Sequence, residues 1–408
     1  MSFGQLPLNA PFQGIVDHIP APYRPPASFD ELLNMWVYRG RLITRPRLND
    51  FTVNPDGSII WNIVPFLDIE GHLHNLILAS NNIYMLTPGP VWNGPLEVQP
   101  WVSTVTYQPG DIVRTDFTHW WVATATSTNQ APPNAAFWQP IPTGSGATGV
   151  PYGVNISQGR VYFSNGSLPG LYSDGEAMLK SMFTPGSFRF IAVLANHMVV
   201  ANTTEPPPGT NGATDYPYRV RWSDNGNATN WIEGSATSAG HQDLLDVPDQ
   251  ITGLATLGRS GFVFRTNGIT QMTPTGLGAS PFQFDALSTA PHGVGNFYPY
   301  SLTVYGTIAM FVSEDDVWSF DGSSFIPVGG VVKPRLFHDI ADANASRIIG
   351  MLFVRCNPQF KYLSYWISIP LTATSLPVTW VYSFDSQSWQ RFQGGDALRQ
   401  TAIANIVI

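Results

Sequence analysis

Residues 216–231 read Tyr-Pro-Tyr-Arg-Val-Arg-Trp-Ser-Asp-Asn-Gly-Asn-Ala-Thr-Asn-Trp, and this stretch decides the fold. From Tyr218 to Trp222 arginine alternates with apolar residues, which is the period of a half-buried strand. The Ser-Asp-Asn-Gly that follows favours a tight turn, because Asn and Gly tolerate positive φ. Arg219 and Arg221 therefore share the face opposite Trp222. We expect the apolar face to pack against a neighbouring sheet and the arginines to be available for a neighbouring subunit.

The composition of the 408-residue chain favours short strands joined by many turns. Hydrophobic residues make up 43% of the chain and charged residues only 12%, while Gly (37) and Pro (35) are abundant. This balance predicts an all-β protein. The single cysteine, Cys356, leaves no internal disulfide framework, and Met1 is not followed by a basic and then an apolar segment. We therefore expect synthesis in a reducing cytoplasm.

Strand–turn–strand units similar to this stretch recur along the chain. Segments with this character lie at 76–84, 160–166, 190–200, 261–269, 308–318 and 361–369. Residues 320–325 and 384–389 both fit Phe-Asp-x-x-Ser-aromatic, and we predict that they are outer-strand turns of successive units. About six antiparallel units of 40 to 60 residues predict a roughly six-bladed β-propeller. A pair of long β-sandwiches is the alternative.

The chain divides by composition into an arm, a repeat region and an insert. Residues 1–30 are rich in proline, so they predict an extended N-terminal arm that drapes over a neighbour. Residues 31–97 and 144–408 form the predicted propeller. Residues 98–143, flanked by Pro- and Gly-rich segments, predict a small inserted β domain. Within the propeller, only 334–344 has the apolar spacing of a short helix.

Four arginines lie close together near the N-terminus. Arg39, Arg41, Arg45 and Arg47 fall in or just after a predicted strand–Gly turn–strand unit at 34–46. These residues are either the solvated face of an edge strand or a contact with an acidic neighbouring subunit or with DNA. The net charge of −8 argues against a surface that coats nucleic acid, but it is compatible with a conduit whose walls repel the phosphates.

The insert resembles the small chitin- and cellulose-binding modules of the carbohydrate-binding 5/12 type. Its matching residues are Trp101, Tyr107, Gly110, Asp111, Val113, Trp121, Ala123, Pro132 and Trp138. The resemblance implies binding to a glycan through exposed rings. Trp120 is the strongest candidate, because it points to the strand face opposite Trp121. Trp101 and Tyr107 are weaker candidates for sugar binding, since both also suit the core of a tiny domain.

The remaining chain resembles the nozzle proteins of short-tailed bacteriophages, also called tail tubular protein B or packaged-DNA stabilisation proteins. The resemblance lies in Arg45-Pro46-x-Leu48, residues 216–231, residues 263–269 and Phe320-Asp321-Gly322, in this order. It implies a virion structural protein that is assembled in the host cytoplasm. Such proteins form a homo-hexameric ring below the portal and adaptor ring and beside tail fibres or spikes. The ring retains packaged double-stranded DNA and conducts it at ejection.

Residues that suggest catalysis or metal binding are explained more simply by structure. Residues 243–249 contain three aspartates and 314–316 are acidic, and we expect solvation to explain both groups. A glycosidase needs two carboxylates facing each other across a sugar. His72 and His74 share a strand face without a third ligand at a recognisable spacing, so we expect neither metal nor cofactor. The alternative function is a glycan-binding lectin or polysaccharide hydrolase on a propeller scaffold.

Overall fold

The computed structural model describes most of the chain between residues 60 and 393. The described ranges are 60–80, 82–87, 91–94, 96–108, 111–115, 120–141, 150–176, 178–182, 186–205, 214–246, 249–278, 280–291, 293–341, 347–357, 360–369 and 378–393, with short strands at 14–15, 28–29, 35–38 and 41–44. In these residues no helix is long and apolar enough to span a bilayer.

Six antiparallel units of four strands follow one another along the described chain. The first contains β5 (Ile60–Leu67), β6 (Leu73–Ala79), β7 (Ile83–Thr87) and β8 (Val91–Asn93). The second contains β15 (Gly153–Ser157), β16 (Arg160–Ser164), β17 (Leu171–Ser173) and β18 (Met178–Ser181), to which β9 (Glu97–Val98) adds a parallel strand. The third contains β19 (Ser187–Leu194), β20 (His197–Glu205), β21 (Thr214–Trp222) and β22 (Gly240–Asp243).

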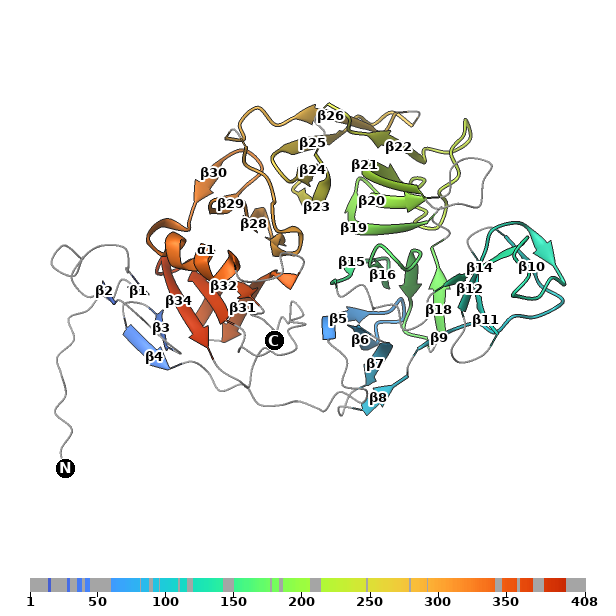
Figure 1. Ribbon diagram of the computed structural model, residues 1–408, viewed down its shortest axis with the longest axis horizontal. Coiled ribbons are helices and arrows are strands. Elements are labelled where there is room, and N and C mark those ends of the chain that lie inside the picture. The colour runs from blue at the N-terminus through green and yellow to red at the C-terminus, as the bar shows by residue number, and fades with distance from the viewer. Residues whose placement is uncertain are drawn as a thin grey trace.

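The last three units repeat the same up-and-down order. The fourth contains β23 (Ile251–Leu257), β24 (Ser260–Arg265), β25 (Ile269–Pro274) and β26 (Phe282–Ala286). The fifth contains β27 (Thr303–Tyr305), β28 (Ile308–Val312), β29 (Val317–Phe320) and β30 (Phe325–Pro327). The sixth contains β31 (Ile349–Asn357), β32 (Phe360–Ile369), β33 (Val378–Ser383) and β34 (Ser388–Gln393). Figure 1 shows the six sheets around a common centre. The predicted all-β class is confirmed.

Most of the repeated sequence units contain the second strand of a sheet, whereas the unit at 190–200 spans the first and second strands of the third sheet. The units at 76–84, 261–269 and 308–318 each contain the second strand and the turn to the third. The echo at 320–325 joins β29 to β30, and the echo at 384–389 lies in the turn from β33 to β34. Both echoes are therefore turns between the outer two strands of neighbouring sheets, as predicted. In the first of them, the rings of Phe320 and Phe325 stack at 4.4 Å between centroids.

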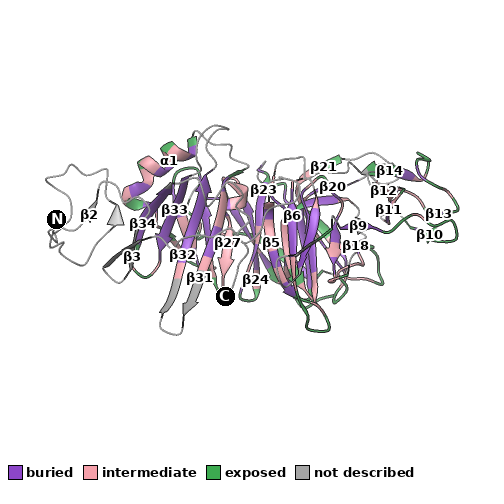
Figure 2. Cartoon of the chain, turned by 90° about the horizontal axis from the view of Figure 1, so that it is seen from below, coloured by how far each residue is buried: buried purple, intermediate pink, exposed green. Residues whose placement is uncertain are grey.

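Neighbouring sheets bury shared apolar cores, which is what period-2 strands with one apolar face require. Between the third and fourth sheets, Val220 and Trp222 of β21 pack with Ile251, Val263 and Phe282. The prediction for the apolar face of this strand is thus confirmed. Similar clusters join the first sheet to the second, the second to the third, the fourth to the fifth and the fifth to the sixth. Buried residues accordingly run along the strands in Figure 2.

A short helix and two N-terminal strand pairs flank the fifth and sixth sheets. Helix α1 (Lys333–Ala341) begins one residue before the predicted range and buries Leu336 and Ile340 in the core that the two sheets share. Strand β1 (Gly14–Ile15) pairs with β2 (Ser28–Phe29), and β3 (Met35–Tyr38) pairs with β4 (Arg41–Thr44), which confirms the predicted strand–turn–strand unit. Both β1 and β3 contact β34 of the same chain.

Residues 100–141 form two small sheets at the edge of the molecule (Figure 1). One pairs β10 (Thr106–Tyr107) with β13 (Ser127–Thr128), and the other contains β11 (Ile112–Arg114), β12 (Trp120–Ala123) and β14 (Trp138–Ile141). Their own core contains Tyr107, Val113, Ala123 and Trp138. This part of the chain lies between the last strand of the first sheet and the first strand of the second, which is where the insert was expected.

Candidate functional site

A cavity of about 500 Å³ lies where the first strands of all six sheets converge. Strands β5, β15, β19, β23, β27 and β31 each contribute residues to its wall, and Figure 1 shows most of these strands around the centre of the molecule. Glycines allow the strands to approach closely. A Cβ at Gly153 would collide with the carbonyl oxygen of Arg189, and a Cβ at Gly350 would collide with that of Ser301. The sequence therefore builds one cavity from segments some 300 residues apart.

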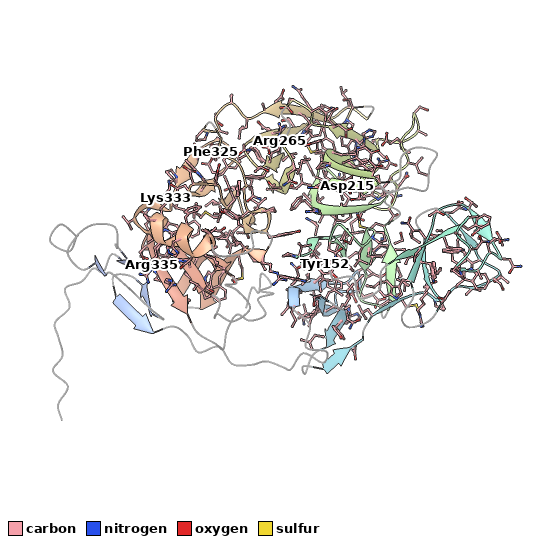
Figure 3. The ribbon with its side chains drawn as sticks, viewed as in Figure 1. Tyr152, Asp215, Arg265, Phe325, Lys333 and Arg335 are labelled. Atoms are coloured by element: carbon pink, nitrogen blue, oxygen red, sulfur yellow. The ribbon has the colours of Figure 1, made fainter. Side chains whose placement is uncertain are left out.

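Polar and apolar groups contribute about equally to the surface of the cavity wall. Tyr152, which Figure 3 places between the first and second sheets, donates from its hydroxyl to the carbonyl oxygen of Ala79 at 3.3 Å. Burial raises the pKa of Tyr152 above its ordinary value. Burial likewise raises the pKa of Tyr300 to about 12, although the nearby Arg189 charge partly opposes the shift. Both phenols stay neutral at physiological pH and can act as hydrogen-bond donors.

Among the described residues that line the cavity, Arg189 alone is charged. The wall holds neither aspartate nor glutamate, so it lacks the carboxylate pair that hydrolysis of a glycosidic bond requires. Sequence reasoning did not single out Arg189. The signal was available, because a lone arginine in the strand Ser-Phe-Arg-Phe-Ile-Ala-Val-Leu at 187–194 interrupts an otherwise apolar pattern.

Arg219 and Arg221 are held by carboxylates of the same chain. Both guanidinium groups contact Oε2 of Glu205, at 3.2 and 2.9 Å. Arg219 also pairs with Asp243 at 2.7 Å, and Arg221 pairs with Glu233 at 2.8 Å. The arginine side chains are only 12% and 11% exposed. Both arginines are thus paired within the chain and mostly buried, and contact with a neighbouring subunit or DNA through them stays a prediction.

The ion pair between Arg219 and Asp243 shifts the pKa of both groups. Hydrogen bonds from Arg219 hold the pKa of the Asp243 carboxyl below its ordinary value, against an opposing effect of burial. The same pairing with Asp243 raises the pKa of Arg219. The central acid, Glu205, is 4% exposed and also accepts a hydrogen bond from the hydroxyl of Thr203 at 2.6 Å. Glu205 is the residue that sequence reasoning missed.

The four N-terminal arginines contribute no described side chain. Arg39, Arg45 and Arg47 lie outside the described residues. Arg41 begins β4, where its backbone pairs with Tyr38, but its side chain is not described. Their predicted contact with a subunit or with DNA therefore stays a prediction.

The candidate sugar-binding rings of the insert take part in packing. Tyr107 is 7% exposed and accepts a hydrogen bond from the backbone amide of Val102 at 2.7 Å. Trp101 is half-buried against the insert core, which also holds Trp121. Trp120 is half-buried on the opposite face, as predicted, and there it packs on the core shared by the first and second sheets. Trp120 therefore helps to fix the insert to the main body, and sugar binding at these rings stays a prediction.

Some of the acidic residues expected to be solvated have structural partners, whereas Glu314 and Asp315 are exposed as expected. Asp243 binds Arg219, and Asp246 receives two hydrogen bonds from Arg265, which Figure 3 marks in the fourth sheet. Asp316 is 9% exposed and accepts hydrogen bonds from the backbone amides of Val317 and Gly329. The solvation expectation is wrong for Asp316, which closes a turn, and incomplete for Asp243 and Asp246, which are 33% and 52% exposed and also neutralise an arginine.

His72 and His74 share an aspartate. The Asp68 carboxylate lies 3.2 Å from Nδ1 of His72 and 2.8 Å from Nε2 of His74. These hydrogen bonds, chiefly that with His74, lower the pKa of Asp68. Within the described ranges, no group of three or more His, Cys, Asp or Glu residues has an arrangement that could hold a metal ion.

Comparisons with known proteins leave the family open. No family model and no curated protein matches the chain. Among solved structures, hydrazine synthase of Kuenenia stuttgartiensis shares 10% identity at a TM-score of 0.32, covering 86% of this chain and all of the other. PorZ of Porphyromonas gingivalis shares 11% identity at a TM-score of 0.25, over 86% of this chain, and a puromycin hydrolase shares 10% at 0.25, over 79%. The matches span 49% and 53% of those two chains.

Proposed function

We propose that this chain is a structural protein of a bacteriophage tail, of the nozzle type, built as a six-bladed β-propeller with an inserted domain. Six copies would form a ring that contacts the portal or adaptor ring and the tail fibres or spikes. The ring would hold packaged double-stranded DNA and conduct it at ejection, with no covalent chemistry of its own. The proposal places the protein in the virion.

One observation carries the proposal. Three segments that resemble nozzle proteins, namely 216–231, 263–269 and 320–322, fall in the third, fourth and fifth sheets in that order. Each occupies a second-to-third or third-to-fourth strand position within its own sheet. The turns after β21 and β29 share the third-to-fourth strand position, as turns in successive blades of a propeller would. The ring of sheets around a shared cavity agrees with that architecture.

The DNA path has to lie between copies of the chain. A cavity of about 500 Å³ has the size of a site for a small molecule. The major groove of B-DNA alone is about 12 Å wide, so a duplex cannot thread the centre of a single propeller. A conduit would therefore be formed by the inner surfaces of several subunits. Its walls would need to repel phosphates, which agrees with a net charge of −8.

Sedimentation velocity of the purified full chain tests the assembly. A ring-forming protein should sediment as a species of six times the 44.7 kDa chain mass, either alone or after addition of the adaptor ring. Co-purification with tailed particles should accompany it. A chain that remains a 44.7 kDa monomer under both conditions and is missing from particles would remove the basis of the proposal.

The alternative is a glycan-binding lectin or a polysaccharide hydrolase on the same scaffold. Release of reducing sugar from a host polysaccharide, abolished by substitution of a single carboxylate, would establish the hydrolase. Glycan binding by the insert is tested separately with Trp120→Ala, and Val122→Ala is the control because Val122 packs on the same core. Loss of glycan binding in Trp120→Ala alone would show that the Trp120 ring contacts the sugar. Equal loss in Trp120→Ala and Val122→Ala would show that Trp120 acts by packing.

A further inference from the structure

We infer that the cavity at the centre of the six sheets is a binding site for a small organic anion, with Arg189 as the residue that receives the carboxylate or phosphate. The inference does not depend on the proposed function. The cavity belongs to a single chain, whereas a tail ring requires several copies.

The charge of the wall is the first observation. Arg189 contributes the one charged side chain among the described lining residues, and no carboxylate of the described chain forms an ion pair with it. Arg219, Arg265 and Arg391 differ from it, because each pairs with an aspartate. Arg189 is exposed and has no acid partner among the described residues, so its guanidinium group is available to an anion at the cavity wall. It offers a planar fork of donors that suits a carboxylate or phosphate.

The position of the Arg189 side chain is the second observation. A Cβ at Gly166 would lie 3.0 Å from Cγ and 3.3 Å from Nε of Arg189. The glycine therefore leaves room for the arginine to lie along the turn that follows β16. On the other side, the Arg189 charge acts on the Tyr300 hydroxyl, whose pKa of about 12 keeps it protonated. A bound anion could accept hydrogen bonds from both groups without any change in protonation.

The other lining residues indicate what kind of uncharged group the anion would carry. Leu254, Leu302 and Met351 provide apolar surface, and Asn155 and Thr303 provide neutral polar groups. Pockets of about 300 to 1,000 Å³ are typical sites for small molecules. A volume of about 500 Å³ therefore suits one monosaccharide-sized or aromatic acid rather than a polymer.

Titration calorimetry of the full chain with two pairs of probes tests the inference. The pairs are benzoate with benzamide and glucuronate with glucose, which differ in charge but are similar in size. We expect at least one anion to bind, and its neutral counterpart to bind about tenfold or more weakly, since the charge-assisted hydrogen bonds are lost.

Two arginine variants locate the site. Arg189→Gln should weaken binding of the anion by about tenfold or more. Arg259→Gln is the matched control, because Arg259 is exposed in the turn from β23 to β24 and does not line the cavity. Circular dichroism checks that both variants are folded. The inference is overturned if neither anion binds at about 10 mM, well above ordinary ligand affinities, or if Arg189→Gln binds as the unchanged chain does. An equal loss of anion affinity in Arg189→Gln and Arg259→Gln would also overturn the inference, because it would show an effect of net charge rather than of a specific site.

Discussion

Glu205 is the residue that determines how the arginine face of β21 is used. It lies on β20, next to β21, and its buried carboxylate contacts both Arg219 and Arg221. Burying a charge without a partner of opposite charge costs free energy, so Glu205, Arg219 and Arg221 stabilise one another in this position. The arginine–aromatic alternation predicted which residues share a face. It could not predict their acid partner, because Glu205 is 14 residues before Arg219 and comes close only through the pairing of β20 with β21.

Replacing the central acid should destabilise the third sheet. Glu205→Gln leaves two buried guanidinium groups without their shared carboxylate, and we expect a loss of about 3 kcal/mol in the free energy of unfolding. Urea unfolding followed by tryptophan fluorescence measures the loss. Glu176→Gln is the control, since Glu176 pairs with Lys180 but is 68% exposed, and its loss should stay below about 1 kcal/mol. Similar small losses in both variants would show that the network is not energetically coupled.

Asp243 should make part of the stability dependent on pH. Its pKa in the folded chain is held by Arg219 below the ordinary value of 3.8, so the unfolded chain takes up the proton first as pH falls. The stabilisation is therefore complete above about pH 4 to 5 and is lost below that range. The difference in unfolding midpoint between the unchanged chain and Asp243→Asn should shrink from pH 6 to pH 3. A difference that is the same at both pH values would contradict the pairing.

At the scale of elements, much of the fold was accessible from local sequence. Alternation and Asn- or Gly-containing turns predicted strands in all six sheets, and the Phe-Asp-x-x-Ser echo predicted equivalent turns in the fifth and sixth sheets. The role of Trp120 could not be predicted in this way. Its packing partner is a core formed by two sheets on either side of the insert, so only the tertiary arrangement defines it. The central cavity was inaccessible for the same reason.

The turn after β21 is fixed by the tryptophan that closes it. Trp231 is 3% exposed and packs between the second and third sheets, whereas its neighbour Ile232 is 75% exposed. Trp231→Ala should cost about 3 to 5 kcal/mol through the cavity that it leaves, and Ile232→Ala should cost less than about 0.5 kcal/mol. Chemical denaturation of the two variants compares the effects directly. Comparable losses would mean that the turn does not anchor the two sheets to each other.

At the scale of the whole molecule, six small sheets around one centre give each sheet two neighbours to pack against. Five shared cores join the sheets in sequence order, and Ile349 of β31 packs on the core of the first two sheets, which brings the last sheet back to the first. Radial packing of this kind buries sheet faces and leaves short edges. The exposed turns at both ends of the strands are then available for contacts with other proteins.

The central claim is that this radial unit assembles into a six-fold ring for DNA passage. Single-particle electron microscopy of the purified full chain, alone and with tailed particles, tests it most directly. We predict closed rings with six-fold symmetry and an opening wide enough for duplex DNA, each subunit showing six sheets around its own centre. A monodisperse monomer that neither forms rings nor is present in tailed particles would contradict the claim.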